Sequence, residues 1–145
     1  MASGRQFCTF FLDHQFFGVG VESVQEVIRY QGMTRVPLAA PVVAGLINLR
    51  GHIVMAVDLR RRLELPLRAA DSLPMNVVVR ADDAAVSLLV DEIGDVLEVA
   101  DDAFEPPPET LRGGARELIR GAFKLEGRLL IVLDAARIVH FDPAS

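Results

Sequence analysis

Apolar and polar residues alternate along much of this chain with a period of two, which is the period of a β-strand that buries one face. Stretches rich in β-branched and aromatic residues predict strands over residues 7–12, 16–21, 44–48, 53–57, 76–80, 85–90, 96–99, 119–125 and 129–133. A three-residue break at 13–15 separates the first two stretches and predicts a hairpin. The sequence therefore predicts a mainly β protein with short connections.

One segment in each half carries a helical signal. In residues 22–29, Ser23 stands three positions before Glu26, which is the spacing of a helix capping box, although valine and isoleucine lower the helix propensity of the segment. Asp91 and Glu92 open the matching segment further along the chain. We therefore expect a short helix over residues 22–29 and a second cap at Asp91-Glu92.

Two aspartates give a second kind of helix signal. Asp58 precedes residues 59–63 and Asp134 precedes residues 135–139, and each aspartate directly follows a predicted strand. Aspartate is a favoured N-cap because its carboxylate accepts hydrogen bonds from the first free backbone N–H groups of a helix. We expect one or two helical turns after each aspartate, closing the ends of the β structure.

The chain contains the same pattern twice. Matching residues recur at a constant shift of 76 positions, in the pairs Gly45/Gly121, Leu49/Leu125, Gly51/Gly127, Asp58/Asp134 and Arg61/Arg137. A fainter match at a shift of about 69 positions relates residues 12–28 to residues 81–97. This repetition indicates a tandem duplication of one small β unit.

Length limits how independent the two units are. The chain has 145 residues, and halves of about 70 residues lie near the lower limit for a separate core. We therefore expect one domain over residues 5–142, with halves at about 7–65 and 75–140 that share a core. Proline and glycine predict a connection at residues 65–74 and a long loop at residues 106–114.

Composition narrows the class of protein. Hydrophobic residues make up 51% of the chain and charged residues 24%, and no apolar run reaches the roughly 18 residues of a membrane span. A net charge of −5, with Arg60-Arg61-Arg62 as the one basic cluster, argues against nucleic-acid binding. A single cysteine, Cys8, and an N-terminus without signal-peptide features favour a soluble, cytoplasmic protein.

The residue types of catalytic and metal sites are present but not in catalytic spacing. The three histidines, His14, His52 and His140, have no metal-ligand spacing, and Cys8 lies in an apolar strand, where a thiol is usually inert. No nucleophile elbow or phosphate-binding loop is present, and the paired carboxylates Asp82-Asp83 fall in a predicted turn. We expect no enzyme activity, no metal and no cofactor.

One stretch of the chain resembles a known family. The residues Gly45-Leu46-Ile47-Asn48-Leu49-Arg50-Gly51, then Ile53-Val54, then Val57-Asp58-Leu59-Arg60, resemble the signature of CheW, the adaptor family of bacterial chemotaxis. The resemblance extends along essentially the whole chain. It implies two intertwined five-stranded Src-homology-3-like β-barrels with short helices, and a non-enzymatic scaffold. Two residues depart from the family pattern, His52 and Met55.

The resemblance also implies partners and a binding site. Members of the family bind the regulatory domain of a CheA-type histidine kinase and the cytoplasmic tip of methyl-accepting chemoreceptors. They are recruited to receptor arrays at the membrane but do not insert into the membrane themselves. Carried onto this chain, the receptor-binding residues are Val24, Glu26, Gly45, Asn48 and Arg50. The kinase contacts stay unassigned, with the strand at residues 86–90 as a candidate.

Several alternatives remain open at this stage. Val24 alternatively packs onto the core, Arg50 alternatively braces loop carbonyls, and Gly45 and Gly51 alternatively serve as turn or close-approach positions. For the whole chain, the alternatives are a CheW-like coupling protein of another pathway, such as one controlling pili or second messengers, and a small-ligand-binding β-barrel sensor.

Overall fold

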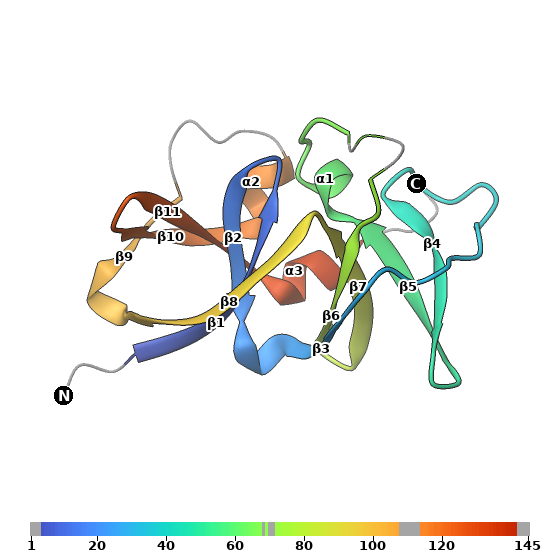
Figure 1. Cartoon of the computed structure of the whole chain (residues 1–145), viewed down its shortest axis with the longest axis horizontal. Helices are drawn as coiled ribbons and strands as arrows, with labels where there is room; N and C mark the ends of the chain where they lie inside the picture. The colour runs from blue at the N-terminus through green and yellow to red at the C-terminus, as the bar shows by residue number, and fades with distance from the viewer. Residues whose placement is uncertain (1–3, 68, 70–71, 108–113, 142–145) are drawn as a thin grey trace.

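Two β-sheets make up most of the protein in the computed structural model, which describes residues 4–67, 69, 72–107 and 114–141 (Figure 1). One sheet has the strand order β8 (Glu92–Ala100), β1 (Gly4–Leu12), β2 (Gln15–Gly20), β11 (Arg128–Leu133), β10 (Ile119–Leu125) and β9 (Phe104–Glu105). The other has the order β3 (Val24–Ile28), β6 (Met75–Ala81), β7 (Ala84–Val90), β5 (His52–Asp58) and β4 (Val43–Leu49).

Short helical segments connect the strands or follow the last of them. They are the 3-10 turns Val21–Ser23 and Asp101–Ala103 and the helices α1 (Leu59–Arg62), α2 (Gly114–Leu118) and α3 (Ala135–Val139). All nine predicted strands are present, so the predicted mainly β class is confirmed. The sequence pattern did not predict β9 or α2; β9 has only two residues and pairs with β10, where Phe104 packs on Phe123 with ring centroids 5.2 Å apart.

The two sheets exchange hairpins. The β1–β2 hairpin from the first half joins β8, β10 and β11, whereas the β6–β7 hairpin from the second half joins β3, β4 and β5. Both sheets contain one parallel pair at the junction, β2 with β11 and β7 with β5. The predicted intertwining is therefore confirmed, but one sheet has six strands rather than the predicted five, because the two-residue β9 adds to its edge. The matching strand orders support the division at about 7–65 and 75–140, which stays a prediction.

Three apolar clusters fill the molecule. The largest lies between the sheets and draws on both halves, and it includes the fully buried Phe10, Leu59, Leu88 and Ile138. Two smaller clusters line the remaining faces of the sheets, one around Phe7, Phe123 and Leu130 and the other around Ile47, Val54 and Ala56. Burying a large apolar side chain stabilises the fold by roughly 1.5–3 kcal/mol, so these clusters supply the main stabilising energy.

The capping aspartates are placed as predicted. Asp58 accepts hydrogen bonds from the backbone N–H groups of Arg60 at 3.1 Å and Arg61 at 3.5 Å, and Asp134 accepts one from Arg137 at 3.2 Å. The first residue of α1, Leu59, and Ile138 of α3 are fully buried in the central cluster. The capped turns therefore anchor both helices in the core, and α3 lies between the sheets (Figure 1).

The predicted helix over residues 22–29 is wrong. A single 3-10 turn ends at Ser23, whose side chain makes no cap, and the next residues form β3. Strand pairing explains the difference, because Val24 lies opposite Val79 and Ile28 opposite Asn76 on β6. The β-branched residues of this segment favour a strand, and pairing across the sheet overrides the local capping-box spacing.

The predicted cap at Asp91-Glu92 is also wrong, because β8 begins at Glu92. The Asp91 carboxylate instead accepts hydrogen bonds from Nε of Arg60 at 3.0 Å and from the backbone N–H of Asp13 at 2.9 Å. Arg60 also donates to the carbonyl of Pro66 at 2.8 Å, and only 13% of its side chain is exposed. The hydrogen bond to Asp91 raises the pKa of Arg60, even though burial lowers it.

This arrangement, which we call the Arg60–Asp91 clamp, joins elements of both sheets. Arg60 lies on α1, Asp91 lies between β7 of one sheet and β8 of the other, and Asp13 lies in the β1–β2 turn. Removing one partner of a largely buried ion pair leaves the other charge without compensation. The clamp therefore holds the corner where the chain passes from one sheet to the other.

We predict that Asp91→Ala lowers the free energy of unfolding by about 3 kcal/mol, because Arg60 stays largely buried without a counter-charge. Urea denaturation followed by circular dichroism measures this. Glu105→Ala is the matched control, since it breaks an exposed ion pair with Lys124 at 3.5 Å and should change stability little. Equal losses in both variants would contradict a special role for the clamp.

Candidate protein-binding site

The β4–β5 hairpin ends in a tight turn formed by Arg50 and Gly51. Their φ angles are +51° and +88°, and the flanking residues Leu49 and His52 pair across the strands. A side chain at Gly51 would meet open space, so the backbone angle is what favours glycine there. The interpretation of Gly51 as a turn residue is therefore confirmed.

Asn48 fixes this turn from within. Its side-chain Oδ1 accepts a hydrogen bond from the backbone N–H of Gly51 at 2.9 Å. Asparagine commonly stabilises turns by bonding backbone groups a few residues ahead. The amide of Asn48 thus holds Arg50 between a paired strand end and a constrained glycine, and the side chain of Arg50 projects from a rigid support.

Arg50 forms an ion pair with Glu26. Nη1 of Arg50 lies 2.9 Å from Oε2 of Glu26, and the side-chain exposures are 79% and 17% respectively. Glu26 lies on β3 and Arg50 follows β4, and these two strands are the opposite edges of the five-stranded sheet. The ion pair therefore bridges the two ends of the sheet and contributes to closing it into a barrel.

The exposures show which side of the ion pair faces outward. The Glu26 side chain is mostly covered, whereas most of the Arg50 side chain is open to solvent. Among the described residues, Glu26 is the one acceptor in contact with the Arg50 guanidinium. Arg50 does not brace loop carbonyls, the alternative left open by the sequence, and its remaining N–H groups are available to a partner.

A shallow groove of 360 Å³ runs beside this ion pair. Besides Glu26 and Arg50 it is lined by Ile53, whose exposed fraction is 64%, and by Arg80, whose Nε donates to Oε1 of Gln25 at 3.1 Å. An exposed isoleucine flanked by charged groups is typical of the centre and rim of a protein interface. Of the two family departures, His52 lines the same groove, whereas Met55 is half-buried in β5.

Sequence reasoning missed Gln25, Ile53 and Arg80 as lining residues. Gln25 and Arg80 come from β3 and β6. Ile53 is the second residue of β5, where the successive exposed residues His52 and Ile53 break the alternation of the strand. The one sequence feature that could have indicated this groove is the apolar Ile53 close to a polar turn. Because residues 22–29 were predicted to be a helix, the pairing of β3 with β6, which brings Gln25 and Arg80 together, could not be foreseen.

Gly45 lies away from the groove. A Cβ atom at this position would stand 2.8 Å from the backbone oxygen of Thr34, whose N–H and C=O both pair with Leu46. Gly121 occupies the matching place in the other sheet, where a Cβ would lie 2.4 Å from the backbone oxygen of Glu105. Both glycines let a crossing segment approach the strand closely, which supports the structural interpretation of Gly45.

Val24 is also mainly structural in its surroundings. It is half-buried, lies opposite Val79 and packs against the central cluster at the start of β3. The five candidate residues therefore separate into three that form the turn and its ion pair, Glu26, Asn48 and Arg50, and two that support the strands around them. Their role in binding a receptor stays a prediction.

Two further observations bear on chemistry and membranes. Burial, together with the negative charge of Glu22, raises the pKa of the Cys8 thiol, which keeps it protonated and poorly nucleophilic. Within the described ranges, no three His, Cys, Asp or Glu side chains gather to hold a metal, and no helix has the length and apolar character to cross a membrane.

A rigid β scaffold that presents an ion-paired turn beside an apolar side chain defines a protein–protein interaction module. The model of the CheW-like domain family matches residues 6–142, and the chain belongs to this family. The fold and the sequence resemblance thus lead to the same family.

Relatives match along nearly their full length. The chain is 31% identical to the chemotaxis protein CheW of Bacillus subtilis (strain 168), over 99% of this chain and 92% of the relative. It is 32% identical to the chemotaxis protein CheW of Rhizobium meliloti (strain 1021), over 90% and 84%. The crystal structure of the scaffolding protein TtCheW from Thermoanaerobacter tengcongensis has the same fold, with a TM-score of 0.81, 24% identity, and coverage of 91% of this chain and 90% of that one.

We predict that Gly45→Ala destabilises the protein by about 1–3 kcal/mol, because the added methyl group would push against the backbone of Thr34, which cannot move without losing its pairing. Gly32→Ala is the matched control, since a Cβ there meets nothing within 4 Å. Thermal unfolding of both variants measures the difference. An unchanged melting temperature for Gly45→Ala would instead return Gly45 to the list of direct contact residues.

Proposed function

We propose that this protein is a non-enzymatic adaptor of chemotaxis signalling that couples chemoreceptors to a CheA-type histidine kinase. It would bind the regulatory domain of the kinase and the cytoplasmic tip of the receptors, and would thereby be recruited to receptor arrays at the membrane. The observation that carries this proposal is membership of the CheW-like family over residues 6–142. The names of the relatives, which are chemotaxis proteins, agree with it.

The groove beside the Arg50–Glu26 ion pair is the proposed receptor site. A receptor tip of two antiparallel helices would present an apolar ridge with polar flanks. Ile53 offers an exposed apolar surface for such a ridge, while Arg50 and Arg80 lie beside it as charged rim groups. The match in chemical character supports this site.

Within this site we assign two levels of action. Arg50 would contact the receptor directly, because its side chain is 79% exposed and its carboxylate partner bonds only to Nη1. Glu26 would orient Arg50, and Asn48 would fix the turn that carries it. Gly45 and Val24 would act only by shaping the strands. All five residues would thus serve binding, although only Glu26 and Arg50 line the groove itself.

The alternative functions have less support. A coupling protein of a pathway that controls pili or second messengers would need the same groove, and no observation favours that assignment. A ligand-binding β-barrel sensor needs internal space, whereas large side chains such as Phe123 and Leu130 fill the region inside the six-stranded sheet. The adaptor function therefore takes precedence.

We predict that Arg50→Glu weakens receptor binding about tenfold or more while kinase binding is retained, because charge reversal at an exposed rim acts locally. Calorimetry with a receptor cytoplasmic fragment and with a CheA-type regulatory domain from the same genome measures both affinities. The melting temperature should stay close to that of the unchanged protein. Loss of both affinities together with a lower melting temperature would show that Arg50 is needed for the stability of the fold and not for receptor contact.

The double variant Arg50→Glu with Glu26→Arg separates contact from positioning. It keeps an ion pair between the two edges of the sheet but reverses the charge that faces outward. If Arg50 contacts the receptor, the double variant stays as weak as the single one. Recovery of receptor binding would show that the ion pair matters only for the shape of the turn. Absence of kinase binding in the unchanged protein would reject the adaptor proposal itself.

A further inference from the structure

Leu38 combines two unfavourable features at the tip of a loop. The backbone N–H of Ala39 donates to the carbonyl of Val36 at 3.4 Å, which closes a turn with Pro37 in second and Leu38 in third place. Leu38 has a φ angle of +63° and an exposed fraction of 97%. A turn with proline in second place and a positive φ in third place favours glycine or asparagine there. Within a single chain, leucine suits neither the backbone nor the solvent at this position, which marks it as a contact residue.

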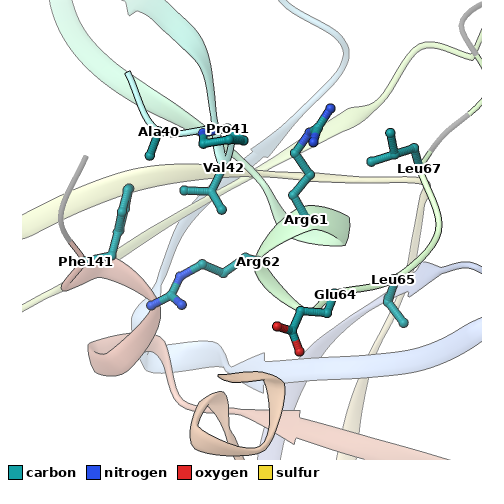
Figure 2. A pocket seen from close by; sticks show the side chains of 9 residues that line it. All are labelled: Ala40, Pro41, Val42, Arg61, Arg62, Glu64, Leu65, Leu67 and Phe141. Atoms are coloured by element: carbon teal, nitrogen blue, oxygen red, sulfur yellow. The ribbon is translucent and has the colours of Figure 1, made fainter. Parts of the chain in front are cut away.

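Two hollows beside this loop join into one surface. The loop hollow, of 760 Å³, is lined by residues 35–41 and by parts of β4 and α1. The α1 hollow, of 490 Å³, has a largely apolar lining (Figure 2), with the side chains of Pro41, Val42, Leu65, Leu67 and Phe141. The two hollows adjoin, because Ala40, Pro41 and Arg61 line both of them. We call the two hollows together with Leu38 the Leu38 face.

Most charges of the Leu38 face already have partners within the chain. Nε of Arg61 lies 3.8 Å from Oδ2 of Asp58. Arg62 donates to the backbone oxygen of Arg137 at 3.2 Å and lies near the negative charge of Glu117. Figure 2 shows the side chains of Arg61 and Arg62 pointing to different sides of the α1 hollow. The face therefore offers no joint charged site to a small ion.

Two opposite charges remain at different ends of the Leu38 face. Arg35 lines only the loop hollow, and Glu64 lines only the α1 hollow. Both residues are exposed, and within the described ranges neither side chain makes a hydrogen bond or an ion pair. The face thus has a free positive group at one end, a free negative group at the other and apolar side chains between them. Such a surface is complementary in charge to a copy of itself turned about a two-fold axis.

We propose that the Leu38 face forms a symmetric dimer with a second copy of this chain. Leu38 of each copy would lie in the α1 hollow of the other copy, against Leu67 and Phe141, and Arg35 of each copy would face Glu64 of the other. A two-fold interface pairs one patch with itself, so each contact forms twice. A second copy is the occupant because the same face supplies the projecting side chain, the hollow for it and both charges. This inference goes beyond the adaptor function and does not rest on it.

The dimer would leave the groove beside Arg50 open. Arg50 precedes β5 and α1 follows it, and seven strand residues at about 3.3 Å each place them roughly 20 Å apart. One inserted leucine and one ion pair per copy make a small interface, and small interfaces give weak, transient complexes. We therefore expect a dissociation constant of about 10–200 μM. The dimer would present two Arg50 grooves at once.

Sedimentation equilibrium of the full chain at about 5–500 μM, a range that brackets this dissociation constant, tests the proposal. The average mass should rise with concentration from that of one chain towards that of two. A mass that stays at one chain up to the highest concentration would overturn the proposal. A mass that grows past two chains would also overturn it, because a two-fold interface closes at the dimer.

Leu38→Asn separates the contact from the fold. Asparagine tolerates a positive φ, so the melting temperature at low concentration should stay the same or rise. Dimerisation should weaken about tenfold or more, because the inserted side chain is lost. Val96→Thr is the matched control: Val96 is 56% exposed on β8 of the other sheet, and its variant should dimerise like the unchanged protein. Equal dimerisation of the Leu38 and Val96 variants would overturn the proposal.

A charge exchange tests the two-fold arrangement. Arg35→Glu and Glu64→Arg should each weaken dimerisation about threefold to tenfold, because each places like charges opposite one another. The double variant restores opposite charges across the interface and should dimerise like the unchanged protein. A double variant weaker than both single variants would show that Arg35 and Glu64 do not meet, and the proposed arrangement would be wrong.

Discussion

The parallel pairing of β5 with β7 and of β2 with β11 is the constraint on which the rest of the structure depends. Each pairing joins a strand of one half to a hairpin of the other, so neither sheet is complete without both halves. A parallel pair requires a long crossover, and here residues 59–83 separate β5 from β7 whereas residues 21–127 separate β2 from β11. The central core, the capped helices and the Arg60–Asp91 clamp all lie along this junction, and the binding groove is built on one of the sheets that it completes.

The two sheets share a strand order but not a surface. Arg50 and Glu26 join the edges of the five-stranded sheet, whereas the matching positions in the duplicated half are Glu126 and Asp95. Two carboxylates cannot form the equivalent ion pair. The glycines show the opposite behaviour, since Gly45 and Gly121 keep the same close backbone approach in both halves. Packing requirements were thus retained in both copies, while the charged turn is specific to one.

The strands and the aspartate caps followed from the sequence, because alternation and capping are local properties of consecutive residues. The strand β3 could not be predicted from the sequence, because pairing with β6, about 50 positions away, decides the conformation of this segment. The family resemblance identified the residues of the turn as binding residues, but it did not predict the ion pair and hydrogen bond that they form. Glu26 and Arg50 are 24 positions apart and meet only when the sheet closes, and Asp91 meets Arg60 across 31 positions. Contacts between distant segments leave no periodic trace in the sequence.

The exchanged hairpins also set the order of events during synthesis. The first hairpin of the chain finds its neighbours only in β8 and β11, where Cys8 faces Val96 and Phe17 faces Ile131. Contacts between residues so distant in sequence slow folding. During synthesis, β1 lacks its second strand partner until β8 has been made, and β2 lacks its own until β11 has been made. Unpaired strand edges and exposed apolar surface favour aggregation, so the exchange that completes both sheets also leaves the nascent chain open to aggregation until its last strands are made.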